Sequence, residues 1–125
     1  MPEKRLSKAE SRVLELFWKL GTSSVREVLE ALPEEERVAY TTLQTLVHRL
    51  EEKGAVRRVK KIGNAHIFEA VYTRKAVYRR LVDDLLEVFG GTAAPLMSHL
   101  AESGKLSLAD VREAERILEK LEKKS

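Results

Sequence analysis

The chain has 125 residues, of which 34% are charged, with a formal net charge of +3; this length suits one domain, or one small domain with an appended segment. It contains no cysteine, which excludes disulfides, thiolate metal sites and cysteine nucleophiles. No apolar run reaches about eighteen residues, and the N-terminal MPEKRLSKAE lacks the apolar core of a signal peptide; we therefore expect a soluble cytoplasmic protein with no membrane partner.

Two amphipathic helices are predicted over residues 8–32. Ser7 with Glu10, and Ser24 with Glu27, have the spacing of capping boxes, so one helix is expected after each serine. A short strand near residues 22–24 is expected to pair with a later hairpin, and the indole of Trp18 to close the core. The predicted inward residues are Ala9, Val13, Leu16, Phe17 and Leu20 in the first helix, and Val25, Val28, Leu29 and Leu32 in the second.

A third helix is predicted from the spacing of Leu43, Leu46, Val47 and Leu50, which form one buried stripe. Gly54 follows the last turn and ends the helix. The opposite face carries Thr41, Thr45, His48 and Glu52, and the flanks carry Thr42, Gln44 and Arg49. Short hydroxyls and a guanidinium suit contacts with base edges and phosphates. The alternative is that these hydroxyls only cap and solvate a surface helix.

A β-hairpin follows directly, with strands predicted over residues 55–61 and 66–72. Gly63 and Asn64 supply the turn. One interpretation of its basic residues is a wing that grips phosphates; the other is an edge strand that carries charge against aggregation. We favour the wing, because it follows a helix suited to the DNA groove, as in a winged helix-turn-helix. The predicted inward residues are Val56, Ile67 and Phe68, and the cations are Arg57, Arg58, Lys60 and Lys61.

Positive charge is concentrated in this middle part of the sequence. Residues 37–80 hold eleven Lys and Arg against three Glu, a net charge of +8, whereas the flanking segments together have a net charge of −5. A basic region between acidic ends is typical of a protein that binds a polyanion. An anionic membrane surface is the weaker interpretation, because the cations do not lie opposite a broad apolar face.

Three more amphipathic helices are predicted over residues 74–89, 94–103 and 108–123, the last capped by Ser107. Their apolar stripes must be covered, either by folding back on the same core or by a second subunit. We favour a dimerisation arm, because symmetric dimers commonly read two half-sites. The predicted domains are thus residues 1–73 and 74–125. The residues expected at the dimer interface are Leu81, Leu85, Phe89, Leu96, Met97, Leu100, Val111, Leu118 and Leu121.

The sequence offers little for catalysis. Gly90-Gly91 lacks the lysine of a phosphate-binding loop, and no nucleophile elbow is present. The carboxylates are expected on solvated helix faces, where burial does not raise a pKa. His48, His66 and His99 lie on three different predicted elements, and none is expected to pair closely with another ligand type. We predict a protein that is not an enzyme and has neither a metal site nor a cofactor.

The sequence resembles a known family, the penicillinase repressors, which include the β-lactamase, methicillin-resistance and copper-transport repressors. The resemblance rests on LSKAESRVLELFWKLG, on SVREVLEALPEEERVAYTTLQTLVHRLEEKGAV and on FEAVYTR, and AYTTLQTLVHRLEEKG is its most specific tract. It implies a mostly α fold with a small β-hairpin wing, and a homodimeric repressor on a palindromic double-stranded DNA operator. The DNA-binding residues it implies are Tyr40, Thr41, Thr42, Thr45 and Arg49 in the third helix, and Lys60, Lys61 and His66 in the wing.

Two departures from the family leave the inducing signal open. The best-known members are cleaved at an Asn-Phe bond, and His99-Leu100 stands at the matching position here. The copper-responsive members use cysteines, which this chain lacks. The inducing partner, a sensor protease or another molecule, is therefore not identified. Two other functions remain as alternatives: a winged-helix protein-interaction module, and a ligand-sensing regulator with a pocket between the arm and the winged helix.

Overall fold

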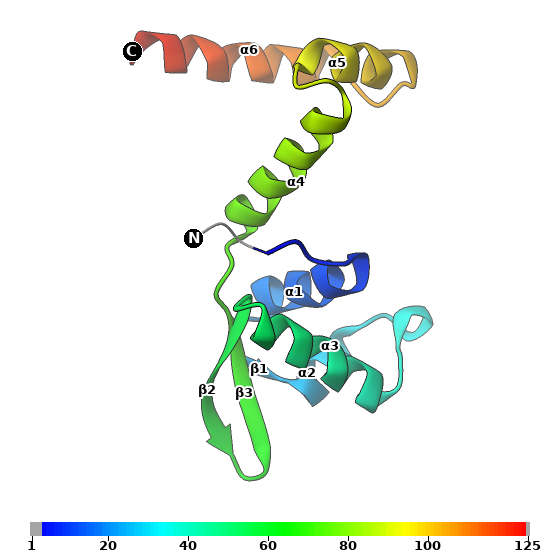
Figure 1. The fold of residues 1–125 in the computed structure, drawn as a ribbon, viewed down its shortest axis with the longest axis vertical. Helices are drawn as coiled ribbons and strands as arrows, with labels where there is room; N and C mark the ends of the chain where they lie inside the picture. Colours follow the sequence, from blue (N-terminus) through cyan, green and yellow to red (C-terminus); the bar gives the residue numbers. More distant parts are fainter. Residues whose placement is uncertain (1–3, 125) are drawn as a thin grey trace. The chain divides into compact units, whose positions relative to one another are not determined.

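The computed structural model describes residues 4–124, and Figure 1 shows the order of their elements. The fold is mostly helical with one small antiparallel sheet, as predicted. The chain divides into two compact units, which end and begin at Leu81 and Val82. The elements are α1 (Lys8–Leu20), β1 (Ser23–Ser24), α2 (Val25–Ala31), η1 (Glu34–Glu36), α3 (Tyr40–Glu52), β2 (Val56–Ile62), β3 (Ala65–Ala70), α4 (Arg74–Val88), α5 (Ala93–Glu102) and α6 (Leu108–Lys123).

The core of the first unit lies between α1, α2, α3 and the sheet. Phe17 and Phe68 meet edge to face, with ring centroids 6.4 Å apart. The predicted inner face of α1 is partly wrong, because Ala9 and Leu20 are exposed while Leu14 is fully buried. Helix α1 packs against α2, α3 and β3 at once, so its buried face is wider than a single stripe. The core residues are Val13, Leu14, Leu16, Phe17, Val25, Val28, Leu32, Leu43, Val47, Leu50, Ala55, Val56, Phe68 and Val77.

Both predicted capping boxes are present. The hydroxyl of Ser7 accepts from the backbone N–H of Glu10 at 3.1 Å, and the carboxylate of Glu10 accepts from the N–H of Ser7 at 2.7 Å. Ser24 and Glu27 repeat the arrangement at 3.2 and 2.9 Å. The expectation that the carboxylates lie on solvated faces is wrong for Glu10, which is 2% exposed. Its pairing with the ammonium of Lys53 at 2.6 Å offsets the cost of burying this charge.

The sheet has the order β1-β3-β2 and is antiparallel throughout. The short strand expected near residues 22–24 is β1, in which Ser23 pairs with Phe68. Gly63 and Asn64 form the two-residue turn of the hairpin, and Gly63 has a φ of +61°, which favours glycine. A bulge between Arg58 and Lys60 shifts the register and gives β2 one extra residue. Val56, Ile67 and Phe68 are buried, as predicted.

The first half of α4 belongs to the first unit and is attached there by Trp18. The indole N–H of Trp18 donates to the carbonyl of Tyr72 at 2.8 Å. The guanidinium of Arg74 lies 4.9 Å from the centroid of the Trp18 ring. The ring of Tyr78 meets the Trp18 ring edge to face, with ring centroids 6.4 Å apart. Val77 is buried in the core. Trp18 thus closes the core, as predicted, and fixes the start of α4.

The second unit contains the end of α4 together with α5 and α6. Ser107 and Asp110 form a third capping box at the start of α6, with hydrogen bonds of 3.0 and 3.1 Å. Helix α5 begins at Ala93, one residue earlier than predicted. None of the described residues from 82 to 124 is buried. Among residues 4–124, no helix is long and apolar enough to cross a bilayer.

Candidate nucleic-acid interface

Helix α3 presents a polar face to solvent. Its buried stripe consists of Leu43, Val47 and Leu50, and Leu46 is half-buried beside it. The predicted contact residues of this helix are on the other side, and all of them are exposed. The hydroxyl of Thr45 donates to the carbonyl of Thr41 at 2.9 Å, which fixes its rotamer. The exposed contact residues are Tyr40, Thr41, Thr42, Thr45 and Arg49.

The first turn of α3 differs from those of α1 and α2. Its N-cap residue is Ala39, which makes no side-chain capping hydrogen bond, and the turn holds no acidic residue. A helix start without a cap offers backbone N–H groups and a partial positive charge to anions. From α2, the guanidinium of Arg26 lies 5.1 Å from the centroid of the Tyr40 ring and adds positive charge here. The first turn of α3 therefore offers hydrogen-bond donors of the kind that bind a phosphate.

The four cations of the wing are not equivalent. The guanidinium of Arg57 pairs with the carboxylate of Glu69. Arg58 pairs with Glu51 of α3 at 2.9 Å, and its guanidinium lies 5.7 Å from the ring centroid of Phe68. Lys60 and Lys61 are exposed and form no ion pair within the part of the chain that the structure describes. Two of the four charges are thus held by intramolecular partners, and two face solvent.

An open groove of about 820 Å³ lies between α2, α3 and the wing. Three of the eight predicted DNA-binding residues line it: Tyr40, Thr45 and His66. The other five lie outside it. Sequence reasoning missed Arg26 and Asn64, because only the fold brings α2 and the hairpin turn beside α3. The lining residues are Ser24, Val25, Arg26, Glu27, Glu30, Tyr40, Gln44, Thr45, Val47, His48, Glu51, Arg58, Ile62, Asn64, Ala65, His66 and Phe68.

Histidines and carboxylates meet in this groove. Nδ1 of His48 lies 3.8 Å from Glu51, and Nε2 lies 3.4 Å from Glu52. The expectation that no histidine is close to another ligand type is therefore wrong at His48, since one helical turn brings these side chains together. His66 is half-buried, and its Nε2 lies 3.3 Å from the guanidinium of Arg58. Among the described residues, no group of three His, Cys, Asp or Glu could hold a metal ion.

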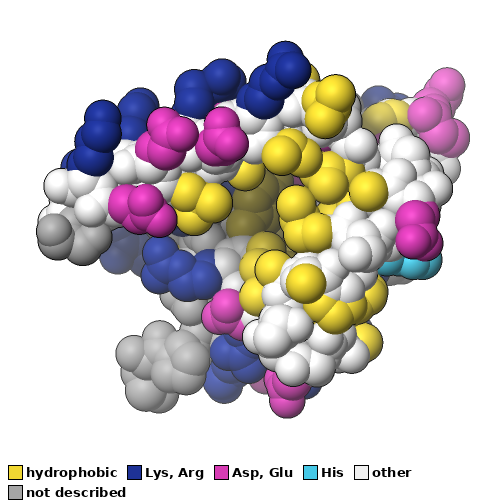
Figure 2. Space-filling model, turned by 90° about the horizontal axis from the view of Figure 1, so that it is seen from above, with side chains coloured by type: hydrophobic (Ala, Val, Ile, Leu, Met, Phe, Trp, Pro, Cys, Tyr) yellow, Lys and Arg dark blue, Asp and Glu magenta, His cyan; other side chains and the backbone are white. Residues whose placement is uncertain are grey.

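The apolar residues predicted for a dimer interface are accessible. In α6, Leu118 and Leu121 are 60% and 59% exposed. Figure 2 shows hydrophobic side chains gathered along one edge of α6 and beside α5, with Lys and Arg along the other edge of α6. Such apolar surface normally marks an interaction site. Of the nine predicted residues, Leu81, Leu85, Met97, Val111, Leu118 and Leu121 are exposed, and Phe89, Leu96 and Leu100 are half-buried.

Comparison with known proteins identifies the family. A family model described as penicillinase repressor matches residues 6–120. The chain belongs to the penicillinase repressor family. The penicillinase repressor of Staphylococcus aureus is 23% identical over 120 residues, which cover 95% of this chain and 94% of the relative. The methicillin resistance regulatory protein MecI of Staphylococcus aureus strain N315 is 24% identical over 115 residues, which cover 92% of this chain and 94% of the relative.

A solved structure of a DNA-binding domain has a fold similar to part of this chain. The solution structure of the DNA-binding domain of the repressor BlaI matches this structure with a TM-score of 0.52 and 26% sequence identity. The match covers 59% of this chain and 89% of that domain. It confirms the winged-helix fold that the sequence predicts.

The pair His99-Leu100 of the present chain, which stands where the best-known family members are cleaved, lies within α5, and His99 is exposed.

Proposed function

We propose that this protein is a transcriptional repressor that binds duplex DNA through α3 and the β2–β3 wing. One observation carries the proposal: the exposed polar face of α3, its uncapped first turn and the free cations of the wing lie in one unit of a penicillinase repressor family member. The relative BlaI is named as a repressor with a DNA-binding domain. The net charge of +8 over residues 37–80 supports a polyanionic partner.

The proposed contacts divide by chemistry. An α-helix fits the major groove of B-DNA, so the start of α3 would face the base edges. Thr42, Thr45 and Arg49 would read bases, since the hydroxyls are short and the guanidinium can bind guanine at two atoms. Lys60 and Lys61 would bind phosphates and supply affinity without sequence preference. Tyr40, Thr41 and His66 would lie beside the sugar-phosphate backbone of the DNA, at the edges of its major groove.

We further propose that two copies associate through α4, α5 and α6 and bind a palindromic operator. The apolar residues that remain exposed on these helices support an isologous contact, in which the same surface of each copy meets the other. Two winged-helix units held in this way read two half-sites at a fixed spacing. Repression would then follow from occlusion, because the bound dimer blocks the polymerase.

The test is a selection of bound sequences from a random duplex library with the full chain, followed by gel shifts. A palindromic consensus is the expected result. Arg49→Ala is expected to weaken binding to that consensus by about 1–3 kcal/mol and to relax its preference at one position. Lys19→Ala, which removes an exposed cation of α1 that is not among the proposed contacts, serves as the control and should leave the preference unchanged. If no sequence is enriched, the repressor proposal fails.

A further inference from the structure

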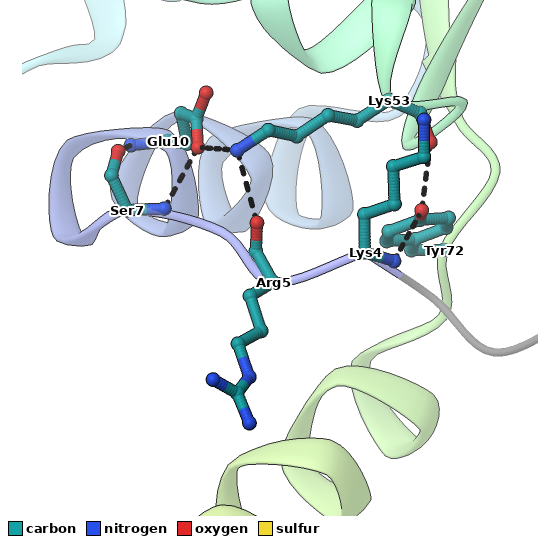
Figure 3. Close-up of polar contacts among 6 residues, drawn as sticks. All are labelled: Lys4, Arg5, Ser7, Glu10, Lys53 and Tyr72. Carbon is teal, nitrogen blue, oxygen red and sulfur yellow. Dashed lines mark hydrogen bonds and ion pairs between the residues drawn. The ribbon is translucent and has the colours of Figure 1, made fainter.

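A partly buried ionic contact lies at the C-terminal end of α3, and Figure 3 shows its members. The ammonium of Lys53, the residue that caps the C-terminus of α3, donates to the carboxylate of Glu10 at 2.6 Å. The same ammonium donates to the backbone carbonyl of Arg5 at 2.9 Å. Glu10 is 2% exposed, whereas the side chain of Lys53 is 30% exposed, so the ion pair is buried on the carboxylate side and reaches solvent on the ammonium side. They connect the end of α3 to α1 and to the segment before it.

Tyr72 closes the arrangement from the other side (Figure 3). Its hydroxyl donates to the backbone carbonyl of Lys53 at 2.8 Å and accepts from the backbone N–H of Lys4 at 2.9 Å. The backbone N–H of Val71 also donates to the carbonyl of Ala55 at 2.7 Å. The last turn of α3 is therefore bonded to three separate parts of the chain: the N-terminal segment, α1 and the residues that lead into α4.

The charges in this contact are well matched. Burial alone raises the pKa of Glu10, but hydrogen bonds from Lys53 and Ser7 and the charge of Lys53 outweigh it, so the pKa lies below its ordinary value. Glu10 is thus ionised at neutral pH and pairs with a full positive charge. Buried ion pairs of this kind add little net stability, because desolvation offsets the attraction. Their directional bonds restrict orientation instead.

A change in the direction of α3 displaces its N-terminal end, which carries the proposed DNA contacts, more than its C-terminal end, where Lys53 is bonded. The helix has 13 residues, so it is about 20 Å long. A tilt of about 5° about Lys53 moves Thr41 and Thr42, which are about 17 Å from it along the helix, by about 1.5 Å. Binding groups must be held to within about 0.5 Å of their working geometry. The closely packed Leu43, Val47 and Leu50 also hold α3 in place, and the hydrogen bonds of Lys53 and Tyr72 add directional restraint at its C-terminal end.

We propose that Glu10, Lys53 and Tyr72 are positioning residues that hold α3 at the angle required to read a DNA sequence. None of the three touches DNA in this arrangement; they act through the helix that does. The inference rests on the proposed function. It predicts that loss of these bonds lowers sequence preference while general affinity for DNA persists, since phosphate contacts tolerate small displacements better than base contacts do.

Two variants of the full chain test the proposal. Tyr72→Phe removes only the hydroxyl. The double variant Glu10→Gln with Lys53→Met removes both charges of the ion pair, so neither charge is left without its partner. Glutamine at position 10 can still complete the capping box with Ser7 at the start of α1. Tyr78→Phe is the matched control, because that hydroxyl accepts from Arg74 at 3.2 Å and is bonded to nothing in α3. Urea denaturation reports whether each variant is folded as stably as the natural chain.

The measured quantity is the ratio of the dissociation constant for random duplex to that for the selected operator, at one salt concentration. Both test variants are expected to lower this ratio about tenfold, the effect of losing one base contact. Binding to random duplex should change less than twofold, and Tyr78→Phe should match the natural chain. An unchanged ratio in the test variants overturns the proposal, whether affinity for both duplexes stays the same or falls equally.

A second readout does not depend on DNA. Residual dipolar couplings of backbone amides give the direction of α3 relative to α1 in the free protein. The test variants are expected to change the couplings of α3 but not those of α1, and Tyr78→Phe to change neither. Identical couplings in all variants overturn the positioning role. If the natural chain enriches no sequence, the proposed function fails on its own, and the couplings still decide whether these residues orient α3.

Discussion

Replacing both solvent-facing wing lysines, with Lys60→Gln and Lys61→Gln, is expected to flatten the salt dependence of DNA binding. These two ammonium groups form no ion pair within the described residues, so they are available to phosphates. Arg57 lies on the same strand as the two lysines, but its guanidinium already pairs with the carboxylate of Glu69. The structure therefore separates wing cations that can displace counterions from one that already has a partner.

The size of the effect follows from counterion release. Each phosphate contact adds about −0.9 to the slope of log K against log salt, so losing two makes the slope shallower by about 1.8. Between about 50 and 200 mM salt, this difference amounts to about 12-fold in affinity. Neutralising Arg57 and Glu69 together, with Arg57→Gln and Glu69→Gln, leaves the net charge unchanged and should leave the slope within about 0.5 of its original value.

Fluorescence anisotropy with a labelled random duplex, titrated at four or more salt concentrations, measures these slopes for the three proteins. A random duplex is used so that the result does not depend on knowledge of the operator. Equal slopes for the lysine variant and the natural chain would show that Lys60 and Lys61 do not bind phosphates. An equally shallow slope in the Arg57 and Glu69 variant would show that the intramolecular ion pair does not set which cations are available.

Three further predictions concern stability and assembly. Leu14→Ala, at a fully buried site, should lower the free energy of unfolding by about 3 kcal/mol in urea; a loss below about 1 kcal/mol would mean that the core closes over the gap. Because its pKa is lowered in the folded state, Glu10 stabilises the fold above its unfolded pKa, about 4.3, and this contribution disappears as the pH falls through the folded value. Urea titrations from pH 7 downwards should therefore give a steeper acid loss for the natural chain than for Glu10→Gln with Lys53→Met, and parallel curves would contradict this. Leu118→Glu with Leu121→Glu should shift the proposed dimer to monomer in sedimentation, and an unchanged molecular mass would exclude α6 from the interface.

The positions of the helices could be predicted from the sequence because their limits are set locally. Ser7 and Ser24 begin helices through bonds to residues only three positions away, and a pattern of that range is visible in the sequence. The hairpin was predicted within one or two residues at each end, since Gly63 and Asn64 fix the turn. Its exact register depends on the bulge next to Arg58, and no local pattern indicates that bulge.

Burial and pairing depend on which elements meet, and there the sequence falls short. Leu14 lies outside the apolar stripe read from α1, yet it is fully buried because α1 has neighbours on several sides. Glu10 was recognised as a cap, but its partner Lys53 is 43 residues away. In the same way, Arg26 reaches the ring of Tyr40 only through the packing of α2 on α3. The eight DNA-binding residues and nine interface residues predicted from the sequence remain predictions.

The exposure of the C-terminal helices links the proposed dimer to the stability of the second unit. A single helix of the length of α6, 16 residues, is only marginally stable in water without a surface to pack on. None of the described residues from 82 to 124 is buried within one chain. A second copy would supply the missing surface, so association and folding of this unit would be coupled. A change that separates the two copies would then destabilise the second unit and also weaken the binding of the dimer to two half-sites. The first unit would keep its stability, because it has its own core and its own hydrogen bonds to α3.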